Sequence, residues 1–273
     1  MFVSSAWDVA RATGVKAQVE IRTLGTLEEA DAVLDVLRKT WGPEPALPRE
    51  LIRAFQASGT PPIGAFHEGR LVGYVLGFLG TDDGGIHLHS HMLAVLPEHR
   101  STGVGRALKL AQRASALSVG VRTVRWTFDP LIARNAYFNL TKLGAVADRF
   151  HRHFYGDMGD ALNRGDRSDR LEVRWDLDRD PAQSPETDVP EADVVLARQG
   201  DDDRPKPVEV DEPGRSARVE IPSDYERLKE RDPELAAQWR DATARALEAC
   251  FEAGLIATSF VRPADYVFTS ESR

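Results

Sequence analysis

The sequence predicts an α+β fold in which a mixed, mostly antiparallel sheet is flanked by helices. Short apolar or alternating segments typical of strands recur along residues 17–177, and segments with apolar residues three or four positions apart, typical of helices, lie between them. Their order is a strand, two helices, three strands, a helix, a strand, a helix and two strands. The strand–helix–strand order at residues 86–128 adds a parallel pair to this sheet.

The individual elements follow from the same periodicities, with glycine and proline marking most of their ends. We expect strands at residues 17–24, 62–67, 71–79, 86–96, 121–128, 145–150 and 171–177, and helices at 27–41, 48–57, 103–118 and 134–143. We expect a loosely held N-terminal extension at residues 1–16 and a main domain at 17–178. A proline-rich acidic linker at 179–192 then leads to a C-terminal α/β extension at 193–273.

The C-terminal extension is expected to contain a strand at 217–222, a helix at 234–253 and strands at 255–261 and 266–268, with loop at 200–214. These strands are too few for a confident independent core, so we expect the extension to pack on the main domain or on a second copy in a homodimer. The stretch from Ala246 to Ile256 faintly echoes that from Ala136 to Val146, as helix, glycine and strand. Coincidence and a half-domain repeat are equally open.

Composition limits the partners and the location of the protein. With 273 residues, 42% of them hydrophobic and a net charge of −8, the chain can form a sizeable core and has no basic block suited to nucleic acid. No apolar run reaches the roughly 18 residues of a membrane span, and the N-terminus lacks the apolar stretch of a secretory signal. The single cysteine, Cys250, excludes an intramolecular disulfide and suits a reducing cytosol, so we expect a cytoplasmic protein with Cys250 packed in its core.

A glycine-rich loop, Arg100-Ser-Thr-Gly103-Val-Gly105-Arg106, joins the strand at 86–96 to the next helix. Glycine lets a ligand approach the backbone closely, and the start of a helix offers N–H groups to a phosphate. The loop lacks the lysine of a Walker loop, and a leucine stands where a dinucleotide fingerprint requires its third glycine. We therefore expect a different phosphate-binding loop, with positive charge supplied by Arg100, Arg106, Lys109 and Arg113.

This loop resembles the pyrophosphate loop of the GNAT superfamily of acyltransferases. The element order over residues 17–177 is similar to the GNAT fold, and Leu140-Thr-Lys142-Leu-Gly144-Ala145 stands where these chains carry Tyr-x-Lys-x-Gly-Phe. Several further stretches resemble an uncharacterised bacterial subgroup of predicted acetyltransferases. The resemblance implies an N-acyltransferase that uses acetyl-CoA or another acyl-CoA as co-substrate, without a metal.

The resemblance also implies where the cofactor lies. The backbone of Leu93 to Val95 would pair with the pantetheine and offer an N–H to the oxyanion, and the amides of Ser101 to Arg106 would hold the pyrophosphate. Asn135 would replace a family asparagine that is Ala133 in this chain. The implied cofactor-binding residues are Leu93, Ala94, Val95, Arg100, Ser101, Thr102, Gly103, Val104, Gly105, Arg106 and Asn135.

Candidates for the catalytic base come from His87, His89 and His91, which alternate along one strand and so share a face. An imidazole titrates near neutrality and can accept the proton of an amine. His89 lies at the distance before Arg100 at which the histone-acetyltransferase branch of GNAT carries its glutamate base, so it is the first candidate and His91 the second. A structural role and a zinc site are the alternatives.

The acid that protonates the leaving thiolate is less clear, because Leu140 occupies the position of the family tyrosine. Tyr137 is our candidate, with Tyr155 and solvent as alternatives. Charged residues around the loop at 155–170 either line the acceptor site or form a solvated surface, with Asp129 and Arg134 free to pair with each other. These residues are Asp129, Arg134, Arg164, Asp166, Arg167, Asp169 and Arg170.

The function predicted is transfer of an acetyl group from acetyl-CoA to the amine of a small molecule, by direct attack in a ternary complex. Transfer from succinyl-CoA or another acyl-CoA to an amino acid-like acceptor is an alternative, since the loop arginines suit a carboxylate. From another class, a non-catalytic CoA-binding regulatory protein would explain the leucine at position 140.

Overall fold

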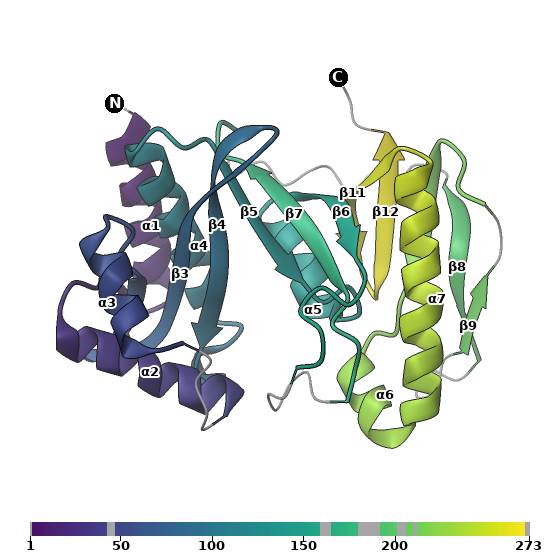
Figure 1. Ribbon diagram of the computed structural model, residues 1–273, viewed down its shortest axis with the longest axis horizontal. Coiled ribbons are helices and arrows are strands. Elements are labelled where there is room, and N and C mark those ends of the chain that lie inside the picture. Colours follow the sequence, from purple (N-terminus) through teal and green to yellow (C-terminus); the bar gives the residue numbers. More distant parts are fainter. Residues whose placement is uncertain are drawn as a thin grey trace. The chain divides into compact units, whose positions relative to one another are not determined.

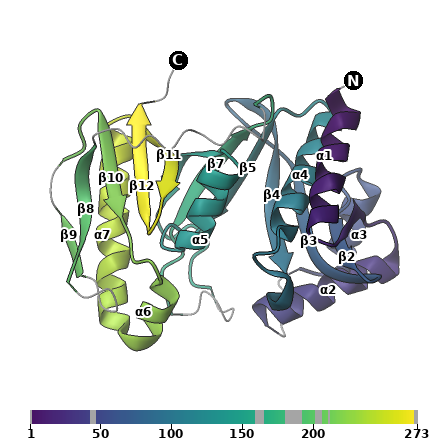
Figure 2. The same cartoon turned by 180° about the vertical axis from the view of Figure 1, so that it is seen from behind.

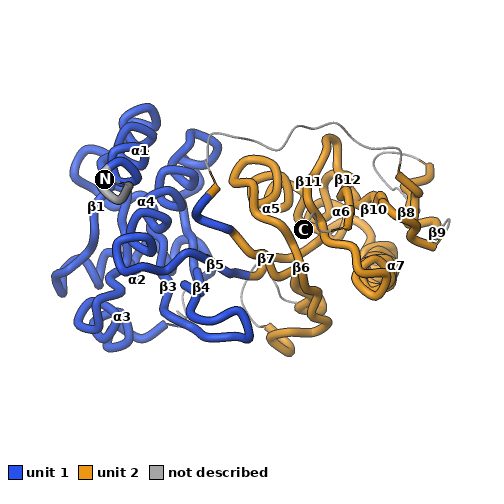
Figure 3. The backbone as a smooth tube through the Cα atoms, turned by 90° about the horizontal axis from the view of Figure 1, so that it is seen from above, with its two compact units in different colours: residues 1–126, 160–162, 176–178 blue, residues 127–159, 163–175, 179–273 orange. Residues whose placement is uncertain are grey.

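The structure is a computed structural model that describes residues 2–42, 47–158, 165–179, 192–200, 206–209 and 212–270. It divides into two compact units, shown in different colours in Figure 3. Of the described residues, those up to Trp126 together with 176–178 belong to the first unit, and the remainder belong to the second.

The first unit is a sheet with helices on both faces (Figure 1). Its strands follow the order β1-β2-β3-β4-β5, with antiparallel neighbours except for the parallel pair β4 and β5. Its elements are α1 (Phe2–Lys16), β1 (Glu20–Thr23), α2 (Leu27–Trp41), α3 (Arg49–Ala57), β2 (Ile63–His67), β3 (Arg70–Asp82), β4 (Gly85–Val95), a 3₁₀ turn (Pro97–His99), α4 (Val104–Ser118) and β5 (Thr123–Phe128), which continues into the second unit.

The N-terminal segment forms a packed helix, so the expectation that residues 1–16 are loosely held is wrong. Helix α1 lies alongside α4, as Figure 2 shows from behind, and buries Ala6 and Ala10. Because α1 covers the side of α4 that faces away from the sheet, α4 is buried on most of its circumference. Small residues at one-turn spacing allow this close approach, and the sequence of α1 alone gives no clear apolar stripe.

In the second unit the strands follow the order β7-β6-β11-β12-β10-β8-β9. Helix α7 begins at a proline after the cap Asp232 and packs across β6, β8, β10 and β11, burying Trp239, Leu247 and Cys250. The elements of this unit are α5 (Ala133–Ala136), the π-helical turn η2 (Tyr137–Lys142), β6 (Val146–His151), β7 (Arg170–Asp176), β8 (Asp193–Gln199), β9 (Lys206–Glu209), β10 (Ser216–Glu220), α6 (Tyr225–Arg231), α7 (Pro233–Glu252), β11 (Leu255–Val261) and β12 (Asp265–Ser270).

Strands β8 and β9 differ from the expectation for the C-terminal region. No strand was expected at the position of β8, and β9 lies within the expected loop at 200–214. Residues 180–191, which make up most of the expected linker, lie outside the described residues. The other expected elements occur close to their predicted bounds, and the α+β class is confirmed.

The two halves of the second unit repeat one arrangement. In each, a helix ends at a glycine with positive φ, Gly144 at 70° and Gly254 at 75°, and two antiparallel strands follow. The halves meet where β6 and β11 pair antiparallel with Ala147 opposite Ala257, each three residues after its glycine. Pairing between equivalent residues is what a local two-fold axis produces. The echo noticed in the sequence is therefore a structural repeat.

None of the helices in the described ranges combines the length and the apolar content that crossing a lipid bilayer requires.

Candidate functional site

Strand β4 pairs with β3 along its whole length, and its described pairing with β5 covers only a short part of the strand. On the β3 side its ladder runs from Gly85 to Val95, with a register shift that leaves His91 as an extra residue between Ser90 and Met92. On the β5 side the described pairs are Leu88 with Val124 and His89 with Arg125. Leu93, Ala94 and Val95 are thus held by β3, on the stretch of β4 beyond the described ladder with β5.

The glycine-rich loop is folded against the end of β4 by its own side chains. The Nε of Arg100 donates to the carbonyl of Val95 at 3.1 Å, and the hydroxyl of Thr102 donates to the carbonyl of His99 at 2.7 Å. Ser101 and Gly103 have φ of 63° and 100°, which turns the chain sharply into α4.

Gly103 is the N-cap of α4, and the first helical bond runs from Ala107 N to its carbonyl at 3.0 Å. The amides of the first turn, at Val104 and Gly105, precede that bond and point out of the helix start. Together with the helix dipole they favour an anion at this end. The loop residues 100–106 are thus brought together as a phosphate site requires.

Two of the four cations expected at the phosphate site, Lys109 and Arg113, have other contacts. Lys109 is buried, and its Nζ donates to the Ser90 hydroxyl at 2.8 Å and lies 3.5 Å from the centre of the Trp126 ring. Burial lowers the pKa of Lys109 well below its usual value. Arg113 donates to the carbonyl of Leu177. The assignment of Lys109 to the phosphate site is therefore wrong, and Arg100 and Arg106 are the cations at the loop.

His89 and His91 lie near one another on β4 with an aromatic neighbour. Their ring centres are 6.1 Å apart, and the Phe78 ring of β3 lies 5.1 Å from His89 and 5.8 Å from His91. Phe55 of α3 stacks on Phe78 at 6.0 Å. His91 keeps an exposed edge, yet the partial burial of its ring lowers its pKa, which favours the neutral imidazole that a base requires.

His87 has other neighbours. Its Nδ1 is 3.9 Å from a carboxylate oxygen of Asp82, and its ring packs over Gly80, where a Cβ would come within 2.9 Å of its Nε2. Among the described residues, no three His, Cys, Asp or Glu side chains gather as a metal ion would require.

Asn135 and Tyr137 belong to the second unit. Asn135 is exposed on α5, and the centre of the half-buried Tyr137 ring lies 5.4 Å from the Lys142 amine and 4.6 Å from the Arg262 guanidinium. Leu140 is fully buried. The expected α-helix becomes a π-helical turn from Tyr137 to Lys142, with Leu143 N bonded to the Phe138 carbonyl. A π turn shifts the side chains that follow by one position, which the sequence pattern did not reveal.

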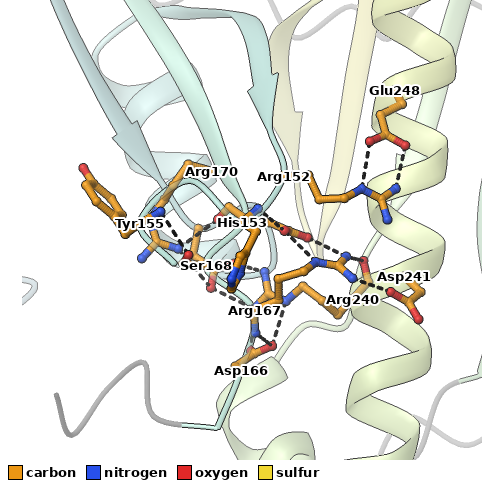
Figure 4. Close-up of polar contacts among 12 residues, drawn as sticks. Arg152, His153, Tyr155, Asp166, Arg167, Ser168, Arg170, Arg240, Asp241 and Glu248 are labelled. Carbon is orange, nitrogen blue, oxygen red and sulfur yellow. Dashed lines mark hydrogen bonds and ion pairs between the residues drawn. The ribbon is translucent and has the colours of Figure 1, made fainter. Parts of the chain in front are cut away.

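The charged residues around the predicted acceptor loop are paired within the second unit. Asp129 and Arg134 do not pair with each other, since Asp129 binds Arg240 of α7 and Arg134 binds Glu226 of α6. Arg167 binds Asp169 and Asp241 (Figure 4), and Arg170 is buried. The interpretation of this loop as a solvated surface is therefore wrong for Asp166, Arg167, Asp169 and Arg170, whereas Arg134 is exposed and Arg164 lies outside the described residues.

Two features of these regions were missed from the sequence. Lys109 lies among residues with helical apolar spacing, so its burial could have been inferred only with knowledge that α1 covers α4. Arg240 lies on the predicted C-terminal helix between Trp239 and Asp241, where an arginine is ordinarily exposed. Its burial depends on carboxylates far away in the sequence.

Cys250 is buried as expected, and burial raises the pKa of its thiol to about 12. The thiolate that a covalent mechanism would require is therefore strongly disfavoured at this residue.

Part of the chain matches a known protein family. Residues 30–140 match the model of the acetyltransferase (GNAT) family. No curated protein matches the chain. Solved structures similar to it include ribosomal-protein-alanine N-acetyltransferase from Brucella melitensis, at 20% identity over 57% of this chain and 98% of that chain, with a TM-score of 0.44.

Two further similar structures carry bound molecules. Naa20 from Chaetomium thermophilum, in complex with a bisubstrate analogue, is 21% identical over 60% of this chain and 90% of its own, with a TM-score of 0.49. The protein yncA from Salmonella typhimurium, solved with its cofactor acetyl-CoA, is 17% identical over 62% of this chain and 99% of its own, with a TM-score of 0.48.

The family match includes β4, the glycine-rich loop and α4, and it ends at Leu140, before Lys142 and Gly144. The resemblance inferred from the sequence is confirmed. Residues 30–140 of this chain are thus similar to the acetyltransferase (GNAT) family.

Proposed function

We propose that the protein transfers the acetyl group of acetyl-CoA to the amine of a small molecule, by direct attack within a ternary complex. The observation that carries this proposal is the course of the chain from β4 to α4. Strand β4 continues beyond His89, the last residue in its described pairing with β5. The chain then turns at Gly103, which has positive φ, and enters α4. Such a course offers backbone groups to an extended cofactor arm and helix N–H groups to its pyrophosphate.

In this proposal the backbone of Leu93, Ala94 and Val95 holds the pantetheine, and an N–H there stabilises the oxyanion that forms on the thioester carbonyl. Residues 101–106 hold the pyrophosphate, and Arg100 and Arg106 add positive charge. Asn135 is proposed as a further cofactor contact. The net charge of −8 supports a small-molecule acceptor over nucleic acid.

For the proton transfers we propose a histidine base. His91 or His89 accepts a proton from the acceptor amine, whose nitrogen forms the new bond to the thioester carbon. The carbon–sulfur bond then breaks, and Tyr137 or solvent protonates the CoA thiolate. The lowered pKa of His91 supports this role because the ring is then neutral over a wider pH range. The burial of Cys250 supports direct attack over an acyl-cysteine route.

The arginines of the acceptor loop weaken the case for a carboxylate-bearing donor. Arg167 is already held by Asp169 and Asp241, and Arg170 donates to the Asp169 carbonyl and lies 4.0 Å from Asp129. Acetyl-CoA is therefore the preferred donor in this proposal.

Thiol release from acetyl-CoA and succinyl-CoA, measured against a panel of small amines, tests the function. We expect release with acetyl-CoA that depends on an amine, together with a loss of about a hundredfold or more when the true base is replaced by alanine. His89→Ala and His91→Ala identify that base, and His67→Ala at the end of β2 is the matched control. Binding of CoA without turnover on any amine would contradict catalysis, and a faster reaction with succinyl-CoA would contradict the donor.

A further inference from the structure

Lys109 of helix α4 contacts strands β4 and β5 just beyond their described pairing. The last described pair joins His89 of β4 to Arg125 of β5. The Nζ of Lys109 donates to the hydroxyl of Ser90 at 2.8 Å and lies 3.5 Å from the centre of the Trp126 ring. These are the next residues of the two strands, so one amine contacts both strands where that pairing ends.

The bond between Lys109 and Ser90 is buried, and both side chains are shielded from solvent. The two hydrogen-bond acceptors of the amine, Ser90 and Gln112, are uncharged, and the oxygen of Gln112 is the more distant at 3.5 Å. A buried donor that loses its acceptor costs free energy, because no water replaces that acceptor. The amine therefore holds the Ser90 hydroxyl in place.

Ser90 is the residue at which the pairing of β4 with β3 becomes irregular. It pairs with Gly77, and the register shift that follows leaves His91 as an extra residue of β4. Gly77 allows the close approach, since a Cβ there would lie 2.6 Å from the carbonyl oxygen of His89 and 3.3 Å from the Cα of Ser90. A β-bulge of this kind redirects the side chains next to it. The bond from Lys109 thus fixes the residue at which the bulge begins.

The bulge places the ring of His91 beside two other rings. Its centre lies 5.8 Å from that of Phe78 on β3 and 6.1 Å from that of His89. His89 is half-buried and pairs on both sides, with Phe78 and with Arg125, whereas His91 is exposed. Of the two candidate bases, His91 is therefore the more accessible, and its position depends on the bulge.

We infer that Lys109 is a positioning residue for acyl transfer, which acts through Ser90 by holding the bulge that fixes the ring of His91. The inference rests on the proposed function, and it selects His91 over His89 as the base of that reaction. Consecutive side chains of a strand point to opposite faces, so Ser90 points away from the ring of His89 and towards α4. All of these residues belong to the first unit.

The test compares Lys109→Met, Ser90→Ala, their double variant and a control in the full-length chain. Ser90→Ala removes the bond but keeps the amine, so it separates the loss of the bond from the loss of a positive charge. Tyr266→Phe is the matched control, because Tyr266 is also buried and its hydroxyl donates a hydrogen bond, at 2.7 Å to the Pro130 carbonyl.

NMR titration of His91, whose signal is the one absent from His91→Ala, reports the surroundings of the ring without any substrate. Partial burial lowers the pKa of His91, so we expect a wild-type midpoint below about 6.5. Without the bond the ring moves into solvent, and the midpoint should rise towards about 6.5 in Lys109→Met and Ser90→Ala but not in Tyr266→Phe. If Ser90→Ala does not fold, Ser90→Cys keeps a weaker acceptor and should shift the midpoint in the same direction, by less.

Acetyl transfer gives the second measurement. We expect kcat to fall about tenfold or more in both single variants, because a misplaced base removes the proton less efficiently, while the KM for acetyl-CoA stays close to its wild-type value. The rising limb of the pH profile of kcat/KM should move to higher pH together with the NMR midpoint. Because the two residues act through one bond, the double variant should be no worse than the worse single variant.

The outcomes separate the two proposals. If the wild-type chain transfers no acetyl group to any amine, the proposed function fails and this inference fails with it. If the wild-type chain is active, and Lys109→Met matches Tyr266→Phe in kcat and in the His91 midpoint, only the inference is overturned. A loss of kcat without a shift of that midpoint also overturns it, as does a double variant whose loss is the product of the two single losses. A pH limb that is lost in His89→Ala and kept in His91→Ala overturns it as well.

Discussion

Lys109 binds Ser90 through a hydrogen bond of 2.8 Å from its Nζ to the serine hydroxyl, and the two side chains are 2% and 5% exposed. The bond joins α4 to β4 one residue after His89, where the described pairing between β4 and β5 ends. A buried amine is costly when charged, so the cation of Lys109 opposes folding even as its hydrogen bond fixes this part of the strand.

The first prediction concerns the pH dependence of stability that Lys109 creates. The pKa of this amine is lower in the folded chain than in the unfolded chain, so the unfolded state binds more protons below about pH 10.4. The free energy of unfolding should therefore rise with pH towards that value, by at most about 1.4 kcal/mol per pH unit. Lys109→Met should remove this rise, whereas Lys39→Met, at an exposed lysine of α2, should keep it. Urea unfolding at pH 7 and pH 9 measures the free energy of unfolding of each variant. An equal change with pH in Lys109→Met and Lys39→Met would contradict a lowered pKa of Lys109.

A second prediction concerns the phosphate loop. A Cβ at Gly103 would lie 3.6 Å from that of Ala17, an ordinary contact, so the site has room for a side chain. An aspartate there should weaken CoA binding about tenfold or more, because its carboxylate would take the N–H groups that a phosphate needs. Gly120→Asp is the matched control, since Gly120 also has positive φ, at 80°, but follows the other end of α4. Titration calorimetry with CoA measures both, and equal affinities would refute the loop assignment.

The third prediction is a pH profile for acyl transfer. Because burial lowers the pKa of His91, its imidazole stays neutral to a lower pH than an ordinary histidine. If His91 is the base, kcat/KM should rise with pH along a limb whose midpoint lies below about 6.5 and should then level off. His91→Ala should lose this limb together with most of the rate. Retention of the limb in His91→Ala and its loss in His89→Ala would assign the base to His89.

A fourth prediction concerns the only cysteine. Cys250 is a buried residue of α7, and burial raises the pKa of its thiol to about 12. A thiol reagent should therefore label the folded chain slowly and the urea-unfolded chain at once. Cys250→Ala should keep acetyl transfer within about twofold of wild type, because a direct attack uses no thiol. A large loss of turnover with normal folding would point to an acyl-cysteine route.

Local patterns were sufficient to predict most of this architecture. Alternation and helical spacing located the strands and helices of residues 17–177, and Thr26 with Glu29 forms the capping box that marks the start of α2. The glycine loop was predictable because its conformation depends on its own residues, with positive φ at Gly103.

The features that could not be predicted depend on residues distant in the sequence. The burial of Lys109 follows from the packing of α1 on α4, and that of Arg240 from two aspartates more than 70 residues before it. Strand β8 was missed because its apolar run is short and single, and such runs also occur in loops. Strand β9 was missed because its four residues, which include a proline, are too few to show an alternation of apolar and polar residues. The π turn at Tyr137 changes spacing without any mark in the sequence.

The pairing of Ala147 with Ala257 has a consequence for how this protein responds to dilution. Two separate copies that met through equivalent strand residues would come apart as their concentration fell, whereas these two segments belong to one polypeptide. The contact therefore stays formed at any concentration, and the strand edge that it covers is closed to foreign strands.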